Sequence, residues 1–228
     1  MDYLIYLVED DENLNQALSA FLQKESWRVQ SFFDGETARA EIINEPHLWI
    51  VDIILPRFNG YQLIKEIKKK SPMLPVIFIS SRDTDIDRIL GLEMGSEDYL
   101  CKPFLPEELI LRCRKLLERV YTTTLPEKIV TFQKTYLLPP YKINIERRFV
   151  TKDDKQIKLT TREFDLLLLF VKNPGLVLSR EQIVQQVWGL DYYVIDRAVD
   201  ELVYRLRKKM PCLLLETSYG YGYQLTDS

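Results

Sequence analysis

The chain has 228 residues, of which 46% are hydrophobic and 29% charged, and its formal net charge is −3 at pH 7. This length and composition predict one or two ordinary globular domains. No run of about 18 apolar residues is present, so we expect no membrane insertion.

The cysteines and the single histidine indicate a protein of a reducing compartment. Cys101, Cys113 and Cys212 are scattered along the chain and form no metal-binding spacing with His47. Scattered cysteines in an odd number fit reduced thiols. The first six residues lack the basic segment and the small-residue cleavage site of a secretory signal. We therefore expect a cytoplasmic protein.

Charge is divided unequally along the chain. Residues 1–121 carry a net charge of −6, whereas residues 122–228 carry +3. An acidic front joined to a basic rear is typical of a regulatory unit followed by a unit that binds a polyanion.

Five short apolar segments alternate with five amphipathic segments in the first 121 residues. The apolar segments are predicted as buried strands, and they span residues 3–8, 28–32, 48–52, 76–79 and 98–101. The amphipathic segments are predicted as helices, and they span about residues 12–25, 35–44, 60–70, 83–94 and 106–121. Five strand–helix units in this length predict an α/β fold with a doubly wound parallel sheet.

Chemically active side chains follow four of these strands. They are Glu9 and Asp10 after the first strand, Asp52 at the end of the third, Ser80 after the fourth, and Lys102 after the fifth. Because parallel strands end at one edge of a sheet, we expect these groups to lie together. Alone, Asp52 is explained more simply as a helix cap. Five such residues at the ends of the correct strands make coincidence a poor explanation.

The cluster suits phosphoryl transfer. Carboxylates hold Mg²⁺, which neutralises phosphoryl oxygens, while an ammonium and a hydroxyl contact the other oxygens. A carboxylate such as that of Asp52 can also act as the nucleophile and form an aspartyl-phosphate.

The first half resembles the receiver domain of bacterial two-component response regulators, which has a flavodoxin-like, five-stranded sheet. The motifs that carry the resemblance are Val8-Glu9-Asp10-Asp11, Asp52-Ile-Ile-Leu-Pro-Arg-Phe-Asn-Gly60, Ile79-Ser80-Ser81 and Lys102-Pro103-Phe104. The resemblance implies that Asp52 is the phosphoacceptor, that Lys102 pairs with the phosphoryl group, and that the Lys102–Pro103 bond is cis. It also implies a Mg²⁺ shell made of Glu9, Asp10, Asp52 and the backbone carbonyl of Ile54.

Two further residues match the switch positions of receivers. Ser80 occupies the position of the switch hydroxyl, where threonine is commoner, and either hydroxyl can donate one hydrogen bond. Tyr99 matches the rotating aromatic residue, although a half-buried packing role would also explain a tyrosine on an edge strand.

Charges of both signs gather on the predicted fourth helix, fifth strand and fifth helix. A solvated face is the ordinary explanation, since single surface pairs contribute only about 0–1 kcal/mol. The OmpR/PhoB subfamily uses this face for a symmetric dimer, which requires a self-complementary patch. By that resemblance the pairs across the two-fold axis are Arg88 with Glu108, Glu93 with Arg114, and Asp98 with Arg119.

The second half follows a polar linker at residues 122–128 and differs in its periodicity. Short strands are predicted over residues 129–132, 141–145, 149–151 and 157–159, with a turn at Asp153-Asp154. Three helices follow, over about residues 161–171, 180–188 and 195–210. The first two have capping-box sequences at Thr160 and Ser179. A hairpin turning near Tyr219-Gly220 ends the pattern.

The third of these helices has a basic side opposite its apolar stripe. A solvated basic face is the usual meaning of such a run. Against it, the helix follows two others in helix–turn–helix order, and a helix of this kind fits the major groove of DNA.

The domain predicted over residues 129–228 resembles the winged-helix DNA-binding domain of the OmpR/PhoB family over roughly residues 129–226. The carrying motifs are Leu159-Thr-Thr-Arg-Glu-Phe-Asp-Leu-Leu167, Ser179-Arg-Glu-Gln-Ile183, Val187-Trp-Gly189, Asp196-Arg-Ala-Val-Asp200, Arg205-Leu-Arg-Lys-Lys209 and Gly220-Tyr-Gly-Tyr223. The implied DNA contacts are Asp200 and Arg205 in the groove, Arg197, Arg207 and Lys208 on phosphates, and Thr217 on the wing. Tyr219 stands where many members have a wing arginine. Short stretches around His47, Ile77–Leu92 and Val187-Trp-Gly189 are similar to regulators of secretion stress.

The sequence therefore predicts a transcription factor, with no enzymatic activity beyond Mg²⁺-dependent self-phosphorylation and slow autodephosphorylation. Its expected partners are a membrane sensor histidine kinase, a second copy of the chain, direct repeats of double-stranded DNA, and RNA polymerase. One rival is an aspartate-nucleophile phosphatase, but such enzymes need an acid/base carboxylate where this chain has Ile54. The other rival is a DNA-binding regulator whose receiver-like half acts independently of phosphate.

Overall fold

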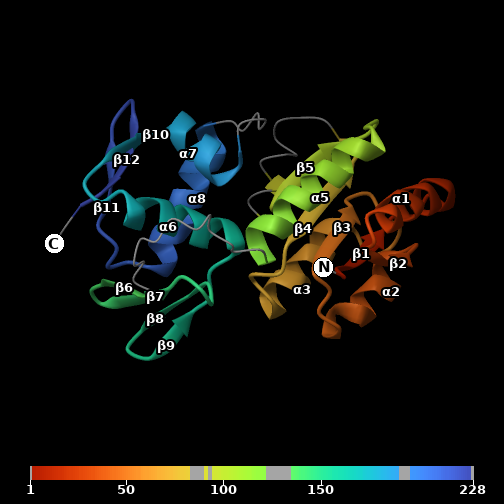
Figure 1. Cartoon of the computed structure of the whole chain (residues 1–228), viewed down its shortest axis with the longest axis horizontal. Helices are drawn as coiled ribbons and strands as arrows, with labels where there is room; N and C mark the ends of the chain where they lie inside the picture. The colour runs from red at the N-terminus through yellow and green to blue at the C-terminus, as the bar shows by residue number, and fades with distance from the viewer. Residues whose placement is uncertain (1, 83–89, 92–93, 122–134, 190–195, 227–228) are drawn as a thin grey trace. The chain divides into compact units, whose positions relative to one another are not determined.

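The computed structural model describes residues 2–82, 90–91, 94–121, 135–189 and 196–226. The chain divides into two compact units between residues 123 and 124 (Figure 1), and each is described by itself. The predicted linker, residues 122–128, lies outside the described residues. None of the helices in the described segments has the length and apolar character needed to cross a bilayer.

The first unit is a five-stranded parallel sheet with the strand order β2-β1-β3-β4-β5, which confirms the predicted doubly wound fold. Its elements are β1 (Leu4–Val8), α1 (Glu12–Lys24), β2 (Arg28–Phe32), α2 (Gly35–Ala40), the 3₁₀ helix η1 (Glu41–Ile43), β3 (Leu48–Asp52), α3 (Gly60–Lys70), β4 (Val76–Ser80), β5 (Asp98–Cys101) and α5 (Pro106–Tyr121). The helix predicted over residues 83–94 lies mostly outside the described residues.

Helices cover both faces of this sheet (Figure 1). Successive side chains of a strand point to opposite faces, so β3 contributes to two cores. Leu48 and Ile50 pack in the core shared with α1 and α5, whereas Trp49 and Val51 pack in the core shared with α2 and α3. All five residues of β3 are buried, and this double burial fixes the position of Asp52 at the end of the strand.

Helix caps account for part of the acidic run after β1. Asp11 is the N-cap of α1, and its side chain accepts hydrogen bonds from the backbone N–H groups of Asn13 and Leu14. A carboxylate at this position satisfies free N–H groups and the positive end of the helix dipole. Capping by Asp11 leaves Glu9 and Asp10 without that explanation.

In its described residues, the second unit combines two antiparallel sheets, with orders β6-β7-β8-β9 and β10-β12-β11, and three helices. The elements are β6 (Thr135–Leu138), β7 (Tyr141–Asn144), β8 (Phe149–Lys152), β9 (Lys155–Ile157), α6 (Thr161–Lys172), β10 (Val177–Ser179), α7 (Arg180–Val187), α8 (Asp196–Lys209), β11 (Leu215–Ser218) and β12 (Gly222–Leu225). This arrangement confirms the winged-helix prediction.

Three strands of the second unit differ from the sequence-based expectation. β6 and β10 were not predicted, and the strand predicted over residues 157–159 instead spans Lys155–Ile157. β10 has only three residues and exists because it pairs with β12, so a local pattern could not reveal it. The strand predicted over residues 129–132 lies outside the described residues.

Local signals in the second unit are confirmed where they depend on neighbours in sequence. Thr160 with Glu163 and Ser179 with Gln182 both form complete capping boxes. The predicted turn between β8 and β9 has both of its aspartates at positive φ, a conformation that aspartate tolerates better than most residues.

The only histidine of the chain connects three segments of the first unit. His47 Nδ1 accepts a hydrogen bond from the backbone N–H of Leu4 at 2.9 Å. Its carbonyl accepts one from the hydroxyl of Tyr121, also at 2.9 Å. The His47 ring lies edge-on to the rings of Tyr3 and Tyr121, with 5.3 Å between centroids in each pair. This contact holds the end of α5 against the start of the sheet.

Acid is expected to weaken this contact. Burial, followed by the charge of Arg28, lowers the pKa of His47, so the folded state favours the neutral ring. The stabilising contribution is therefore present above the ordinary histidine pKa of about 6.5 and is lost as the pH falls below it. We expect His47→Asn, which keeps an acceptor but does not titrate, to show a smaller fall in unfolding free energy than the wild type between about pH 7.5 and about pH 5.5. Denaturant unfolding at the two pH values measures it, and equal falls in both proteins would contradict the role of His47.

Candidate phosphorylation site and DNA interface

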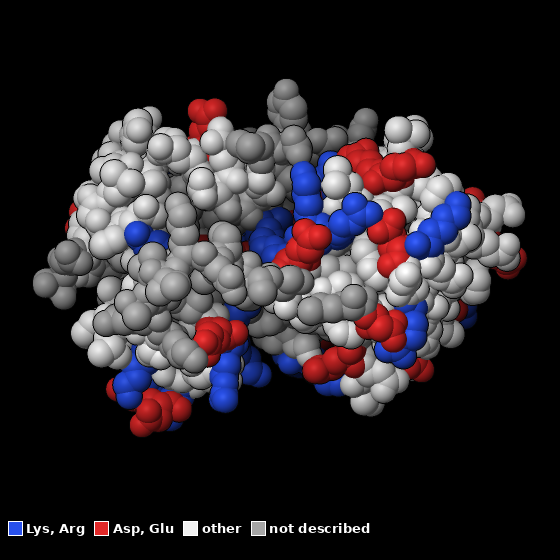
Figure 2. All heavy atoms as spheres, viewed as in Figure 1, with Lys and Arg blue, Asp and Glu red and all other residues white. Residues whose placement is uncertain are grey.

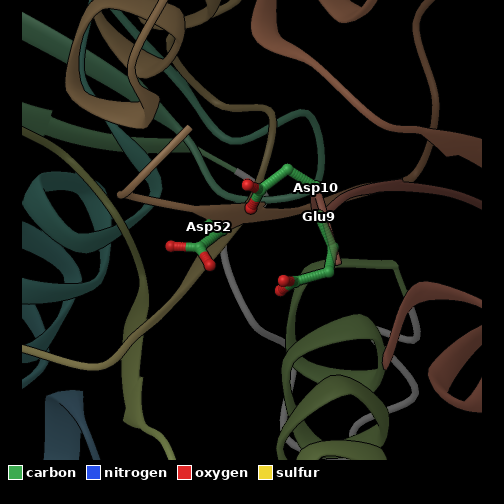
Figure 3. Close-up of side chains that lie close together, drawn as sticks. All are labelled: Glu9, Asp10 and Asp52. Atoms are coloured by element: carbon green, nitrogen blue, oxygen red, sulfur yellow. The ribbon is translucent and has the colours of Figure 1, made fainter. Parts of the chain in front are cut away.

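Three carboxylates meet at the carboxyl edge of the parallel sheet. Glu9 and Asp10 follow β1, Asp52 ends β3, and candidate metal-ligand atoms of the three residues all lie within 4.8 Å of one another. Figure 3 shows the three side chains around a common space. Glu9 and Asp52 are buried, whereas Asp10 is exposed. Hard cations such as Mg²⁺ prefer this all-oxygen donor set, so the residues fit a divalent metal.

Lys102 connects two of these carboxylates. Its Nζ donates hydrogen bonds to Glu9 Oε2 at 2.6 Å and to Asp52 Oδ2 at 2.5 Å. The lysine follows β5, and its backbone N–H donates to the carbonyl of Ser80 at 2.7 Å. The Lys102–Pro103 bond is cis, as the resemblance implies. The predicted meeting of β1, β3 and β5 residues at one edge is therefore present in the structure.

The ionisation of the cluster reflects both burial and pairing. Burial raises the pKa of Glu9 to about 7, although the hydrogen bond from Lys102 opposes this. For Lys102, burial acts to lower the pKa, but the hydrogen bonds to Asp52 and Glu9 outweigh it and raise the pKa. Lys102 therefore stays an ammonium. It neutralises much of the negative charge that the cluster would otherwise carry.

The loop after β3 is shaped by a close backbone approach. The N–H of Ile54 donates to Asp52 Oδ1 at 2.7 Å, which places the Ile54 backbone beside the carboxylate. A Cβ atom on Gly60 would lie 2.3 Å from the Asp52 carbonyl oxygen, so only glycine fits at this position. The structure puts Ile54 next to Asp52, and its carbonyl remains a predicted metal ligand.

Asn15 holds the backbone next to the acidic cluster, and no sequence motif indicated this role. This side chain is fully buried in α1, and its Nδ2 donates to the carbonyls of Glu9 and Phe32, each at 3.0 Å. It thereby joins the ends of β1 and β2 to the helix. The only sequence signal for this role was a single asparagine on the apolar face of α1.

The two predicted switch residues meet at Arg82. Ser80 is fully buried, and its Oγ accepts a hydrogen bond from the Arg82 N–H at 3.1 Å. The hydroxyl of Tyr99 donates to the Arg82 carbonyl at 2.8 Å, and the Tyr99 side chain is buried rather than turned outward. Both residues therefore hold the same peptide segment after β4. The sequence does not reveal that both residues contact the Arg82 backbone, because a backbone contact does not depend on which side chain is present.

The predicted dimer residues are placed only in part. Arg88 and Glu93 lie outside the described residues. Arg112 pairs with Asp98 at 3.1 Å and with Glu108 at 2.7 Å. Arg114 pairs with Glu25 at 2.6 Å. The face shown in Figure 2 carries acidic and basic side chains close together over α5. These pairs lie within one chain, and the predicted pairing of Glu108, Arg114 and Arg119 with a second copy stays a prediction.

Helix α8 presents only some of its predicted DNA-contacting residues to solvent. Arg197 and Lys208 are exposed. The side chain of Arg205 is 18% exposed, and its Nε lies 3.9 Å from Glu201.

Asp200 and Arg207 connect α8 to its neighbours. Asp200 Oδ1 accepts hydrogen bonds from Arg180 at 2.8 Å and from the Tyr223 hydroxyl at 2.6 Å. Arg207 donates to the Leu215 carbonyl and, at 3.0 Å, to Thr217 Oγ1. These bonds hold α7 and the β11–β12 hairpin, which is the predicted wing, against α8. The sequence predicted that Asp200, Arg207 and Thr217 contact DNA, and it did not predict these hydrogen bonds within the unit.

Two family profiles match the chain. The family described as "Response regulator receiver domain" matches residues 5–114, and the one described as "Transcriptional regulatory protein, C terminal" matches residues 154–225.

Known proteins are similar over the full length. The transcriptional regulatory protein CssR of Bacillus subtilis is 52% identical, with 100% of both chains covered. The transcriptional regulatory protein CreB of Escherichia coli is 33% identical, covering 97% of this chain and 96% of CreB. The solved structure of response regulator DrrB, a Thermotoga maritima OmpR/PhoB homologue, is 31% identical with a TM-score of 0.52, and the match covers 99% and 100% of the two chains.

The fold, the acidic site and these similarities define a two-component response regulator. The chain belongs to the OmpR/PhoB family. It is a DNA-binding transcription regulator that works with a histidine kinase.

Proposed function

We propose that a sensor histidine kinase activates this regulator by phosphorylating Asp52. A carboxylate oxygen of Asp52 attacks the phosphorus of the phosphohistidine, an O–P bond forms, and the N–P bond breaks. The single observation that supports this most is the contact of Lys102 with both Glu9 and Asp52, because the ammonium is placed where a phosphoryl oxygen would bring negative charge.

The metal in this proposal is Mg²⁺. Glu9, Asp10 and Asp52 would supply carboxylate oxygens, and Ile54 would supply its backbone carbonyl. When bound, the ion neutralises charge on the phosphoryl oxygens. The convergence of three carboxylates supports this assignment.

The output of phosphorylation is proposed to be a dimer. A phosphoryl group near Lys102 would draw the hydroxyl of Ser80, whose Oγ now holds Arg82, and Tyr99 shares that partner. A change at Arg82 would therefore reach both switch residues. The dimer would use the charged face of α5, and phosphorylation would favour it by a coupling of about 1–3 kcal/mol.

The two units are proposed to have separate roles. We propose residues 1–121 as the receiver, residues 122–128 as the linker, and residues 129–228 as the DNA-binding domain. In the dimer, the wing and the α8 helix of each copy would bind one repeat of a direct repeat in double-stranded DNA. The DNA-bound dimer would then contact RNA polymerase. The 52% identity to CssR over the full chain supports the proposal that the regulated genes answer secretion stress.

Phosphorylation of Asp52 is tested with a small phosphodonor. Incubated with acetyl phosphate and Mg²⁺, the wild type should gain one phosphoryl group by intact-mass measurement, and chelation of the metal should prevent the gain. Asp52→Asn should gain none, because the amide is not a nucleophile of this kind.

The matched control is Asp11→Asn. It removes a carboxylate one residue from the cluster and keeps a good helix cap, so it should be phosphorylated like the wild type. Phosphorylation of Asp52→Asn at the wild-type rate would refute the proposal. A wild type that stays unmodified yet binds DNA would instead identify the receiver as a phosphate-independent module.

A further inference from the structure

The DNA-binding unit exposes tyrosines on only two of its described elements. Tyr204 on α8 is 57% exposed, and Tyr219 and Tyr221 at the turn of the β11–β12 hairpin are 95% and 53% exposed. Among the other tyrosines described in this unit, Tyr141 and Tyr223 are buried. A large aromatic side chain left in water has most of its apolar area available for a partner.

Exposed cations flank Tyr204 on the same side of α8. Arg197 lies seven residues before it and Lys208 four residues after it, and both are exposed. Residues spaced by four and seven positions share one face of a helix. The neighbouring Arg205 is mostly buried, and Arg207 is held by Leu215 and Thr217. The outward face of α8 therefore carries an aromatic ring between two cations, with the half-exposed carboxylate of Asp200 one turn before the ring.

The occupant of this face is indicated by charge and by family membership. Cations that frame an aromatic side chain suit a nucleic acid, in which phosphates lie beside flat, partly apolar bases. The helix is also held rigidly, because Tyr223 and Arg207 bind it to the hairpin. A rigid helix face of this kind fits the major groove of double-stranded DNA.

We propose that Tyr204 is a specificity-determining residue, whose ring packs against the C5-methyl group of a thymine in the major groove while Arg197 and Lys208 contact the flanking phosphates. The thymine methyl is the one apolar group that base pairs present in that groove. The inference rests on DNA binding and does not depend on the proposed phosphorylation of Asp52. It adds Tyr204 to the residues predicted to lie in the major groove. An apolar ring packs favourably against a methyl group, whereas a charged side chain does not.

The test uses duplexes that the wild-type full chain, treated with acetyl phosphate and Mg²⁺, enriches from a random-sequence pool. Single thymidines of the enriched duplex are replaced by deoxyuridine, which lacks only the methyl group. At one position this replacement should weaken wild-type binding by about fivefold to tenfold. Tyr204→Ala should bind the thymine duplex more weakly by a similar factor and should not distinguish thymine from uracil there.

Two variants serve as controls. Tyr204→Phe keeps the ring and should keep the preference for thymine. Tyr219→Ala removes a tyrosine side chain from the hairpin turn and should also keep the preference for thymine. Because Tyr204 is exposed, its replacement should leave the denaturant midpoint of the protein unchanged, which separates a lost contact from a lost fold.

Salt dependence gives an independent readout. Tyr204→Ala should lower affinity equally at all salt concentrations, whereas Lys208→Ala should reduce the slope of log affinity against log salt by about one. The proposal is overturned if Tyr204→Ala still prefers thymine, if the wild type ignores every uracil replacement, or if Tyr204→Phe loses the preference. A wild type that enriches no duplex would contradict DNA binding itself along with this proposal, whatever the state of Asp52.

Discussion

Replacing Lys68 with methionine is expected to lower the free energy of unfolding by about 3–5 kcal/mol, because it removes an ammonium that contacts a buried carboxylate in the first unit. Lys68 Nζ donates to Glu97 Oε1 at 2.9 Å and to the Leu74 carbonyl at 2.7 Å. The other oxygen of Glu97 accepts the N–H of Val76 at 2.6 Å. The Lys68 side chain is 8% exposed and that of Glu97 is 0% exposed, so water cannot replace the lost ammonium.

The neighbouring Lys69→Met is the matched control. Lys69 lies on the exposed side of α3, and its loss should change the unfolding free energy by less than about 0.5 kcal/mol. The double variant Lys68→Met with Glu97→Gln should lose less than the sum of the single variants, since it leaves no buried charge. Denaturant unfolding of the full chain measures the wild type and the four variants. A loss of under about 1 kcal/mol for Lys68→Met would show that the pair behaves like a surface ion pair.

This pair matters to the site because of where it lies. Glu97 immediately precedes β5, the strand that carries Tyr99 and leads to Lys102. The ion pair thus anchors the start of β5 to α3 and β4. The chemistry is at the other end of the same strand.

Lys102→Met is expected to slow phosphorylation from acetyl phosphate by about a hundredfold, the usual effect of removing a preorganised charge that stabilises a transition state. The same change should make Mg²⁺ bind more tightly. Lys102 contacts both Glu9 and Asp52, and its removal leaves the carboxylates with more negative charge for the ion. Rate and affinity should therefore move in opposite directions.

The two readouts are a phosphorylation time course by intact mass and a Mg²⁺ titration by calorimetry. Lys65→Met, on an exposed position of α3, is the control for loss of a cation and should alter neither. If Lys102→Met weakened Mg²⁺ binding and slowed phosphorylation together, Lys102 would act by holding the loops in place. The electrostatic role argued above would then be wrong.

The arrangement of the acidic site was predictable because the relevant signals are local. The first four residues of β3 are apolar and the fifth is Asp52, a pattern best explained by a strand buried on both faces. The order of strands and helices then requires that strand ends share an edge. Glu9, Asp52 and Lys102 come together for this reason, although they are separated by up to 93 residues.

Partners that depend on distant packing could not be predicted. Asp200 was expected in the DNA groove, yet its carboxylate holds Arg180 and Tyr223. Nothing within a few residues of Asp200 indicates either partner, since a polar side chain on a helix can turn to solvent, to DNA or to a neighbour. Arg82 is a similar case, because its role lies in the backbone and not in its side chain.

The sequence by itself determined the two-unit organisation, the parallel sheet, and the group of carboxylate and lysine residues that meet around Asp52. It could do so because hydrophobic periodicity and helix caps act over a few residues, and strand order follows from them. Only the tertiary structure decided which polar side chains form hydrogen bonds or ion pairs within the chain and which face solvent. That choice depends on contacts between segments far apart in sequence, as when Arg207 is held by the hairpin while Tyr204, one turn away on α8, stays exposed.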